Sequence, residues 1–392
     1  MGGCAGGTAR DMLLAMREPR RVIDVRALGE TREVLACHDG GLFPVLCCAG
    51  GAMVAAVRGG AGHLGLAGRV EVIRSLDGGA TWSPPAVVAD SERDDRNPAL
   101  GRAADGTLVL AYQRMGCYDA DGVYRPELLG PDGRAPIEVM ITRSGDAGLS
   151  WDASAPLGVA GVADGSPYGK IACLEDGALL LAIYARAGGG RAASYLVRSA
   201  DGGRTWSEPA LIAGDMNETA LCPLRGGGVL AVMRGADASQ SLHAARSSDG
   251  GRSWSPPEPV TGPHRHPADV VELASGDVLL TYGNRAPPYR IEGLLSGDGG
   301  ASWRDCLLLF SGALHGYGGE VARIDLGYPS SAIGRGDGRG RGATMYYVNP
   351  ASSRAGEEPA HLRPPYRADG YRAVAVTWSE EQLVDAARRA LV

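Results

Sequence analysis

The segment Ser-Leu-Asp-Gly-Gly-Ala-Thr-Trp at residues 75–82 decides the fold, because its pattern S-x-D-x-G-x-[ST]-W recurs along the chain. Four further copies follow, at residues 144–151, 199–206, 247–254 and 296–303. Five of the six Trp residues of the chain close one of these copies. In each copy the Asp side chain can accept backbone N–H groups of a tight turn, and Gly supplies a positive φ. The repeat therefore predicts a structural turn, with its Trp packed between neighbouring sheets.

A second repeat lies between these turns and consists of an apolar strand, a Gly-rich turn and another apolar strand. Turns such as residues 104–106, Ala-Asp-Gly, are typical of β-hairpins. The six copies are spaced by about 50 to 70 residues and begin at Phe43, Asn97, Tyr168, Asn217, His266 and Tyr328. Six hairpins and five turns predict an all-β fold, a six-bladed β-propeller with four-stranded antiparallel blades.

Closure of such a ring requires the N-terminal region to complete the last sheet. Residues 21–26 or residues 33–36 are apolar enough to pair beside residues 373–377. Residues 379–391 predict a short amphipathic C-terminal helix capped by Ser379. No linker divides the chain, so we expect a tail at residues 1–19 and a single propeller at residues 20–392.

Bulk composition narrows the class of protein. The net charge of −6 argues against a nucleic-acid partner, because phosphate binding needs a basic face. The eight Cys residues show no C-x-x-C spacing, which favours buried free thiols over a zinc site. No apolar run approaches the length of a membrane span, and the N-terminus lacks the apolar stretch of a signal peptide. We therefore expect a cytoplasmic protein with no membrane partner.

One face of the predicted propeller gathers positive charge. Adjacent strands of a blade are antiparallel, so the start of each first strand and the end of each second strand meet at the same mouth of the central channel. Five of the six second strands end in Arg or run directly into it: Arg58, Arg114, Arg186, Arg234 and Arg285. Because guanidinium groups match carboxylates, this mouth is a candidate site for an anionic ligand.

The repeated turn is similar to the Asp box of the sialidase (neuraminidase) superfamily, and the resemblance extends over nearly the whole chain. It implies a retaining glycoside hydrolase with a Tyr nucleophile held by a Glu, three Arg residues that clamp the substrate carboxylate, and an Asp acid/base. The segment containing Glu218 and Arg234 resembles the family's Glu strand and second clamp Arg. Arg285 stands where the third Arg is expected, and the segment Gly-Tyr-Pro at residues 327–329 makes Tyr328 the expected nucleophile.

Two departures from that family pattern affect the expected site. Phe43 stands where the first clamp Arg would be, and either Arg58 or Arg96 is a candidate to replace it. His63 stands near the place of the acid/base Asp, and Asp95 or its neighbour Asp94 is an alternative acid.

Two further residues at the strand starts, Tyr168 and His266, are expected to contact the substrate. His264 and His266 flank Arg265 on a strand, where no third ligand is evident, so neither a metal nor another cofactor is expected. We expect the partner to be a carbohydrate substrate that the protein recognises at an anionic group.

Three functions remain open from the sequence. The first is an exo-acting glycoside hydrolase, resembling an exo-α-sialidase, that removes a terminal anionic or sialic-acid-like sugar. The second is a propeller-type uronate polysaccharide lyase that uses His63, Tyr328 and Arg285. The third is a non-catalytic carbohydrate-binding propeller. Contact between Tyr328 and Glu218 favours the first, whereas His63 facing Tyr328 across the pocket favours the second.

Overall fold

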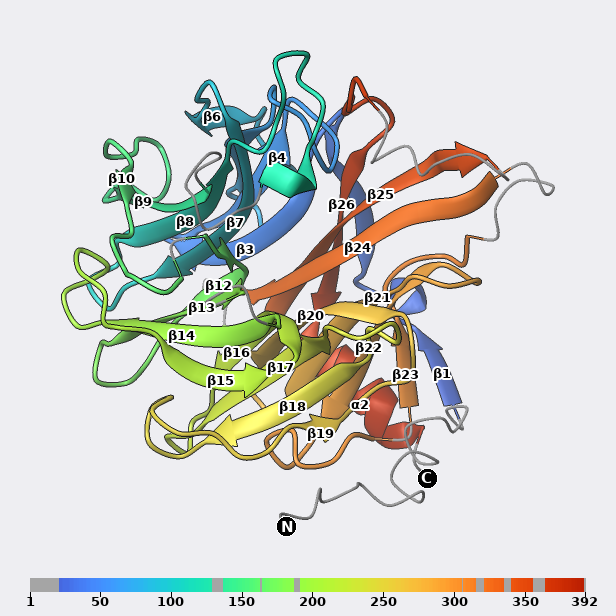
Figure 1. Cartoon of the computed structure of the whole chain (residues 1–392). Helices are drawn as coiled ribbons and strands as arrows, with labels where there is room; N and C mark the ends of the chain where they lie inside the picture. The colour runs from blue at the N-terminus through green and yellow to red at the C-terminus, as the bar shows by residue number, and fades with distance from the viewer. Residues whose placement is uncertain are drawn as a thin grey trace, which may run out of the picture.

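Short antiparallel strands account for nearly all of the regular structure of the chain (Figure 1). The structure is a computed structural model that describes residues 21–128, 137–162, 164–186, 191–304, 306–314, 321–334, 340–354 and 364–390. The expected tail at residues 1–19 lies outside this part of the chain. Within it, the strands form an all-β propeller, and no helix is long and apolar enough to cross a membrane.

The described strands make five sheets, of which the first two lie in the N-terminal half of the chain. One has the order β3-β4-β5-β6, with β3 (Leu42–Ala49), β4 (Ala52–Gly59), β5 (Arg69–Ser75) and β6 (Ala86–Ala89). A nine-stranded sheet follows, with β7 (Asp94–Arg102), β8 (Leu108–Met115), β9 (Ile137–Ser144), β10 (Ala155–Pro156), β11 (Ser166–Pro167), β12 (Gly169–Cys173), β13 (Leu179–Ala185), β14 (Ala193–Ser199) and β15 (Ala210–Gly214). In this sheet β7 and β12 pair in parallel, and every other pairing is antiparallel.

The other three sheets come from the second half of the chain and its N-terminal strands. One contains β16 (Met216–Pro223), β17 (Val229–Gly235), β18 (Leu242–Ser247) and β19 (Glu258–Pro259). The next contains β20 (Arg265–Glu272), β21 (Val278–Asn284), β22 (Arg290–Ser296), β23 (Cys306–Leu309) and β1 (Arg21–Asp24). The last contains β24 (Val321–Ile333), β25 (Arg341–Arg354), β26 (Arg372–Ser379) and β2 (Arg32–His38). Two single-turn 3₁₀ helices are also described, η1 (Val25–Ala27) and η2 (Pro126–Leu128).

Closure of the ring uses the second of the two expected N-terminal segments. Strand β2 pairs antiparallel with β26, with Val34 opposite Ala375, which confirms the expectation for residues 33–36. The expectation for residues 21–26 is wrong, because β1 instead pairs in parallel with β23. The first strands contact one another in the order β3, β7, β12, β16, β20 and β24, and β24 returns to β3. These strands therefore surround a common axis.

The repeated segments form turns, as the sequence predicted, and they join β5 to β6, β9 to β10, β14 to β15, β18 to β19 and β22 to β23. In the first copy, the hydroxyl of Ser75 and the backbone N–H of Thr81 both donate to Oδ1 of Asp77, at 2.8 and 2.9 Å. The indole N–H of Trp82 donates to the carbonyl of Gly79 at 3.1 Å. The Trp residues pack against the buried clusters between sheets, so the repeat stabilises the turn and the packing of neighbouring sheets.

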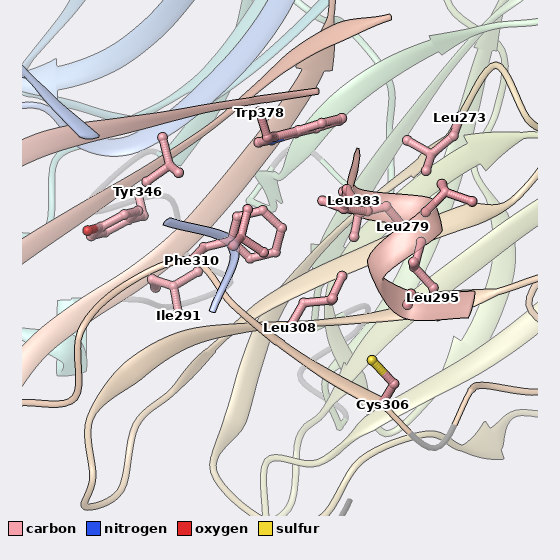
Figure 2. Packing of buried hydrophobic residues seen from close by; sticks show 14 of the residues in the cluster. Leu273, Leu279, Ile291, Leu295, Cys306, Leu308, Phe310, Tyr346, Trp378 and Leu383 are labelled. Atoms are coloured by element: carbon pink, nitrogen blue, oxygen red, sulfur yellow. The ribbon is translucent and has the colours of Figure 1, made fainter. Parts of the chain in front are cut away.

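The C-terminal helix α2 (Glu380–Arg389) confirms the predicted amphipathic segment. Ser379 caps it by accepting the N–H of Gln382 at 3.4 Å. Its buried face, which includes Leu383, packs with Trp378, Leu308 and other apolar side chains into one cluster (Figure 2). Helix α2 thus covers the apolar surface of the two sheets that receive the N-terminal strands.

Irregularities at the start of the first strands matter for the site. The pairing register shifts between Leu42 and Val45 in β3, and equivalent shifts occur in β7, β16, β20 and β24. Phe43, Asn97 and Tyr328 lie within these bulges and have φ values of 53°, 49° and 51°. A positive φ is unusual for bulky side chains, and bulges redirect side chains. The bulges therefore direct these three residues away from the regular alternation of their strands.

Candidate active site

Tyr328 and Glu218 meet directly at the mouth of the propeller. The phenol of Tyr328 donates a hydrogen bond to Oε1 of Glu218, and Nη1 of Arg234 donates to the other carboxylate oxygen at 2.7 Å. Glu218 lies in the bulge of β16 and is buried, while Arg234 comes from the end of β17. The arrangement gives a phenol a base within hydrogen-bond reach, and a guanidinium holds that base in place.

The surroundings of Tyr328 keep its phenol protonated. Burial raises the pKa of Tyr328 well above its ordinary value, and the negative charge of Glu218 raises it further. Arg234 partly opposes this rise. Tyr328 can therefore act as a nucleophile only if its proton moves to a neighbouring base as it attacks.

Asp325 organises a second cluster, two residues before Gly327 on β24. Its carboxylate is fully buried and accepts hydrogen bonds from Nη2 of Arg285 at 2.7 Å, from the hydroxyl of Tyr347 at 2.9 Å and from the hydroxyl of Tyr371 at 2.7 Å. Nε2 of His63 lies 2.7 Å from its Oδ2. Segments far apart in the sequence thus converge on one carboxylate.

His63 lies in the loop after β4, among charged groups and aromatic rings. Its Nε2 is 2.9 Å from the hydroxyl of Tyr347, and its ring centroid is 4.9 Å from that of Phe43. Burial lowers the pKa of His63 below its ordinary value. Asp325 opposes this shift, whereas the positive charges of Arg285 and Arg96 add to it.

Aromatic rings lie between the pair of Tyr328 and Glu218 and the cluster around Asp325. The ring of Phe43 lies 4.6 Å from that of Tyr328 and 5.6 Å from that of Tyr347, measured between centroids. A pocket is lined by Phe43, Tyr328 and Glu218, together with residues from other first strands. Tyr168 and Tyr184 also line it. The pocket combines apolar walls with a few polar groups, as small-ligand sites do.

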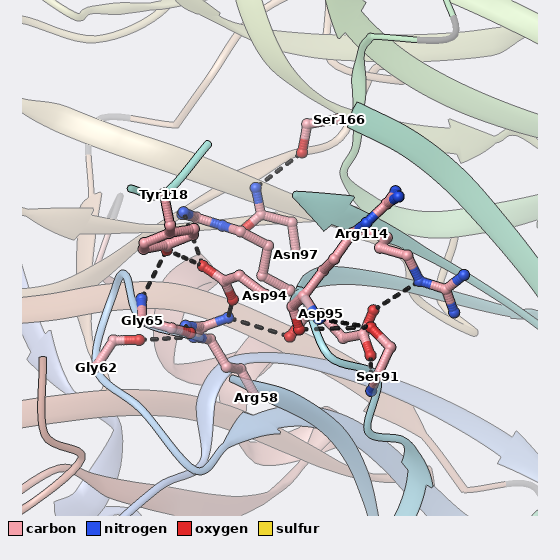
Figure 3. Close-up of polar contacts among 12 residues, drawn as sticks. Arg58, Gly62, Gly65, Ser91, Asp94, Asp95, Asn97, Arg114, Tyr118 and Ser166 are labelled. Carbon is pink, nitrogen blue, oxygen red and sulfur yellow. Dashed lines mark hydrogen bonds and ion pairs between the residues drawn. The ribbon is translucent and has the colours of Figure 1, made fainter. Parts of the chain in front are cut away.

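Of the two Arg residues proposed to replace the first clamp Arg, Arg96 directly precedes Asn97, which lines the pocket. The charge of Arg96 acts on both Tyr328 and His63, and its Nη1 is 3.8 Å from Oδ2 of Asp94. Arg58 is fully buried and paired with Asp94 (Figure 3). Its remaining donors reach backbone carbonyls, including that of Gly62 at 2.6 Å. The guanidinium of Arg58 is therefore occupied within the protein.

Arg58 instead anchors the loop that carries His63. Tyr118 adds a second anchor, because its hydroxyl accepts the N–H of Gly65 at 2.7 Å and contacts Asp94 (Figure 3). A Cβ atom at Gly68 would lie 2.3 Å from Oδ1 of Asp94, so this position requires glycine for the pair with Arg58 to form. The position of His63 thus depends on a buried ion pair outside the pocket.

The candidate acids Asp95 and His63 also differ in where they lie. Asp95 is buried, and its carboxylate accepts the N–H of Ser91 at 2.7 Å and a bond from Arg114 at 3.3 Å (Figure 3). The contacts with Ser91 and Arg114 thus hold the Asp95 carboxylate within its own sheet region. Between the two, His63 is the candidate that the structure brings to the cluster around Phe43.

Tyr168 and His266 are both buried near the pocket. The ring of Tyr168 lies 5.8 Å from that of Tyr328, and its hydroxyl donates to the carbonyl of Ala268 at 2.5 Å. Tyr168 therefore supports Tyr328 from the side. His266 precedes Pro267 in the bulge of β20, and its carbonyl lies close to Gly327 beneath Arg285.

From the sequence, Asp325 is only one of the residues at the start of a first strand, with no assigned role, and Tyr371 is not a candidate. Asp325 lies on a predicted strand. Its partners lie far from it in the sequence, so no local pattern marks its role. The alternation of side chains along a strand predicts that either Tyr346 or Tyr347 faces the channel. Tyr347 does so, while Tyr346 packs into the apolar cluster beside α2 (Figure 2).

The comparisons with known proteins agree with this architecture. The model of the BNR repeat-like domain matches residues 51–341. The chain belongs to the BNR repeat-like family. No curated protein matches the sequence of this BNR-repeat chain.

Solved structures similar to this BNR-repeat chain are mainly sialidases with a propeller fold. A protein of unknown function from Dyadobacter fermentans is 21% identical with a TM-score of 0.70, and the match covers 89% of this chain and 99% of that one. Hadza microbial sialidase is 14% identical with a TM-score of 0.63, covering 88% and 66%. Trypanosoma rangeli sialidase in complex with sialic acid is 14% identical with a TM-score of 0.63, covering 94% and 61%. At these identities the likeness concerns the fold.

Proposed function

We propose that this protein is an exo-acting glycoside hydrolase that removes a terminal anionic, sialic-acid-like sugar through a Tyr nucleophile. The observation that carries the proposal is the hydrogen bond from the phenol of Tyr328 to Glu218. A neutral phenol is a poor nucleophile, and a carboxylate at hydrogen-bond distance is the base that it needs. The fold that this chain shares with the sialidases described above supports the same class of reaction.

In the proposed first step, the phenol oxygen of Tyr328 attacks the anomeric carbon while its proton passes to Glu218. The bond to the leaving group breaks, and protonated His63 supplies a proton to the departing oxygen. In the second step, neutral His63 takes a proton from water, and the water oxygen displaces Tyr328 from the anomeric carbon. Tyr328 then recovers its proton from Glu218, which restores the starting state.

The substrate's anionic group is proposed to lie against Arg96, Arg234 and Arg285. The latter two are already paired with Glu218 and Asp325, so part of their charge is balanced within the site. A Tyr nucleophile suits such a substrate, because a neutral phenol avoids the repulsion between an attacking carboxylate and a substrate carboxylate. Phe43, which stands in place of the first clamp Arg of the family pattern, presents an apolar wall to the sugar.

The proposal includes six blades and one propeller over residues 20–392. The nine-stranded sheet divides at the parallel contact of β7 and β12 into two antiparallel meanders, and the other four sheets each supply one blade. The first strands of the six blades would then surround the pocket, which takes one lining segment from each of them.

A uronate lyase is the second candidate, and one observation favours it. His63 lies 2.9 Å from the hydroxyl of Tyr347, so a base and a phenolic acid are adjacent. The ring of Phe43, however, packs against both His63 and Tyr328, so the lyase arrangement would use Tyr347 in place of Tyr328.

The test is a screen of the purified protein against fluorogenic sialosides and uronate-containing glycans, beside Tyr328→Phe. Release of fluorophore that is lost in the variant supports the hydrolase. Growth of ultraviolet absorbance on a uronate polymer, which reports a new C=C bond, would replace it with the lyase. Binding without turnover in either assay would leave a carbohydrate-binding propeller.

A further inference from the structure

The carboxylate of Asp325 receives hydrogen bonds from three donors, one guanidinium and two phenols. Arg285 reaches Oδ1 at 2.7 Å, Tyr347 reaches the same oxygen at 2.9 Å, and Tyr371 reaches Oδ2 at 2.7 Å. A guanidinium has only hydrogens to offer, so Asp325 must be the acceptor toward Arg285. The two phenols complete the solvation of a carboxylate that water does not reach. The site therefore holds Asp325 as an acceptor.

This fixes which nitrogen of His63 carries a hydrogen. Nε2 of His63 is 2.7 Å from Oδ2 of Asp325, and an ionised carboxylate has no hydrogen to donate. The nearby hydroxyl of Tyr347 directs its own hydrogen to Asp325, so it too can only accept from Nε2. Whichever oxygen takes the bond, the hydrogen belongs to Nε2. The other ring nitrogen, Nδ1, is then the atom that titrates.

We infer that Asp325 is the positioning residue of the site, which holds His63 as the Nε2–H tautomer so that Nδ1 exchanges the catalytic proton. The use of that proton in catalysis rests on the proposed function, whereas the tautomer does not. Asp325 also pairs with Arg285, so one buried carboxylate sets both the acid/base and one member of the anion clamp.

The groups that face His63 determine how its protonation responds to a change at Asp325. Asp325 from β24 favours the charged imidazole, whereas Arg285 and Arg96 disfavour it. Phe43, Tyr347 and Tyr371 contribute neighbouring aromatic rings that exclude water. Replacing Asp325 with Asn removes a negative charge beside His63, while the positive charges of Arg285 and Arg96 stay. The pKa of His63 should therefore fall further.

The first experiment needs no change at Asp325. Protein labelled with ¹⁵N in its seven His residues is examined by NMR, and the His63 signals are assigned by their loss in His63→Gln. We expect Nε2 to appear protonated and Nδ1 to appear as the unprotonated nitrogen in the neutral ring. A neutral ring protonated at Nδ1 would overturn the inference, whether or not any substrate is known.

The second experiment compares Asp325→Asn with Asp277→Asn. Asp277 is also a buried carboxylate held by two Arg residues, Arg304 and Arg388, but it lies at the opposite end of β21. We expect the pKa of His63 to fall by roughly 1 to 3 pH units in Asp325→Asn and to stay unchanged in Asp277→Asn. An unchanged pKa in both variants would contradict the inference.

If Asp325→Asn does not fold, Tyr371→Phe takes its place. This change removes one hydrogen-bond donor from Asp325, so the carboxylate interacts more strongly with its remaining partners. We therefore expect the Nε2–H tautomer to persist and the pKa of His63 to rise. A lowered pKa in this variant would count against the assignment. If the NMR results hold but no glycan is turned over, the positioning role stands and the proposed hydrolase fails.

Discussion

The phenol of Tyr328 is hydrogen-bonded to the carboxylate of Glu218, although 110 positions separate the two residues in the chain. Both lie in bulges of first strands, Tyr328 near the middle of β24 and Glu218 near the start of β16. A bulge places an extra residue in one strand and turns its side chain out of the ladder. The same local irregularity, on two strands that face a common axis, thus brings together the proposed nucleophile and its proposed base.

Replacement of Tyr328 by Phe tests this relationship with little change in volume. We expect kcat/KM on the substrate found in the screen to fall by about 10³-fold or more, because the attacking oxygen is removed. Steady-state kinetics provide the measurement. Tyr346→Phe is the matched control. Tyr346 is also a buried Tyr, but it lies on β25 and packs into the apolar cluster beside α2. Equal activity loss in both variants would point to a general effect of removing a hydroxyl.

The pH profile should reflect the lowered pKa of His63. Burial shifts this pKa down, so the protonated form that donates to the leaving group predominates only at pH values below that lowered pKa. As the pH rises through the lowered pKa, kcat/KM on a substrate with a poorly acidic leaving group should fall. A fluorogenic aryl glycoside, whose leaving group needs less protonation, should show a smaller decline. Measurement of kcat/KM for both substrates from about pH 4 to about pH 9 gives this difference.

An acid limb with the opposite sign would assign a different role to His63. If both substrates gain activity as the pH rises through the same pKa, neutral His63 is acting as a base in the limiting step. Tyr328 should contribute no limb in this range, because its pKa is raised well above the ordinary value.

The sequence predicted the repeated turns, the closing strand and the capped helix because each depends on residues close together in the chain. The contact of Tyr328 with Glu218 followed from a family resemblance and lay beyond any local pattern. The cluster around Asp325 escaped prediction for a physical reason. Its donors come from a loop, two strands and a segment before β26, and only the closed ring brings them to one carboxylate.

Arg58 and Arg96 illustrate the same limit on a smaller scale. Both are Arg residues at strand ends, and from the sequence each was a candidate clamp. The difference is that the pairing of β7 with its neighbours places Asp94 where it neutralises Arg58 completely, while Arg96 keeps a longer contact of 3.8 Å to the same carboxylate. Charge at a strand end therefore predicts a ligand site only after the buried partners are known.

Substitution of Arg96 by Lys tests its place in the anion clamp. We expect KM for an anionic sugar to rise about 10- to 100-fold, because an ammonium cannot reproduce the planar pair of donors that a guanidinium offers a carboxylate. The expected change in kcat is smaller. Arg114→Lys is the control, since Arg114 also ends a strand but bonds Asp95 and Tyr112. A similar rise in KM for both variants would argue for a diffuse effect of charge at the mouth.

Replacement of Arg58 by Met tests the anchor beneath the His63 loop. The change leaves Asp94 buried beside fewer donors, and breaking a buried pair from one side typically costs about 3–5 kcal/mol. We expect the free energy of unfolding, measured by urea denaturation, to fall by roughly that amount. Arg191→Met is the control, because Arg191 is 85% exposed and its pair with Asp215 should contribute about 1 kcal/mol or less.

The double variant Arg58→Met with Asp94→Leu separates the anchor's two roles. Removing both charges should recover much of the stability lost in Arg58→Met, because no unpaired charge remains buried. The contact from Arg58 to the carbonyl of Gly62 is still missing, however, so the loop that carries His63 keeps less support. Recovered stability with kcat still below the wild-type value would establish that the buried pair positions His63. Recovery of both would reduce its role to stability alone.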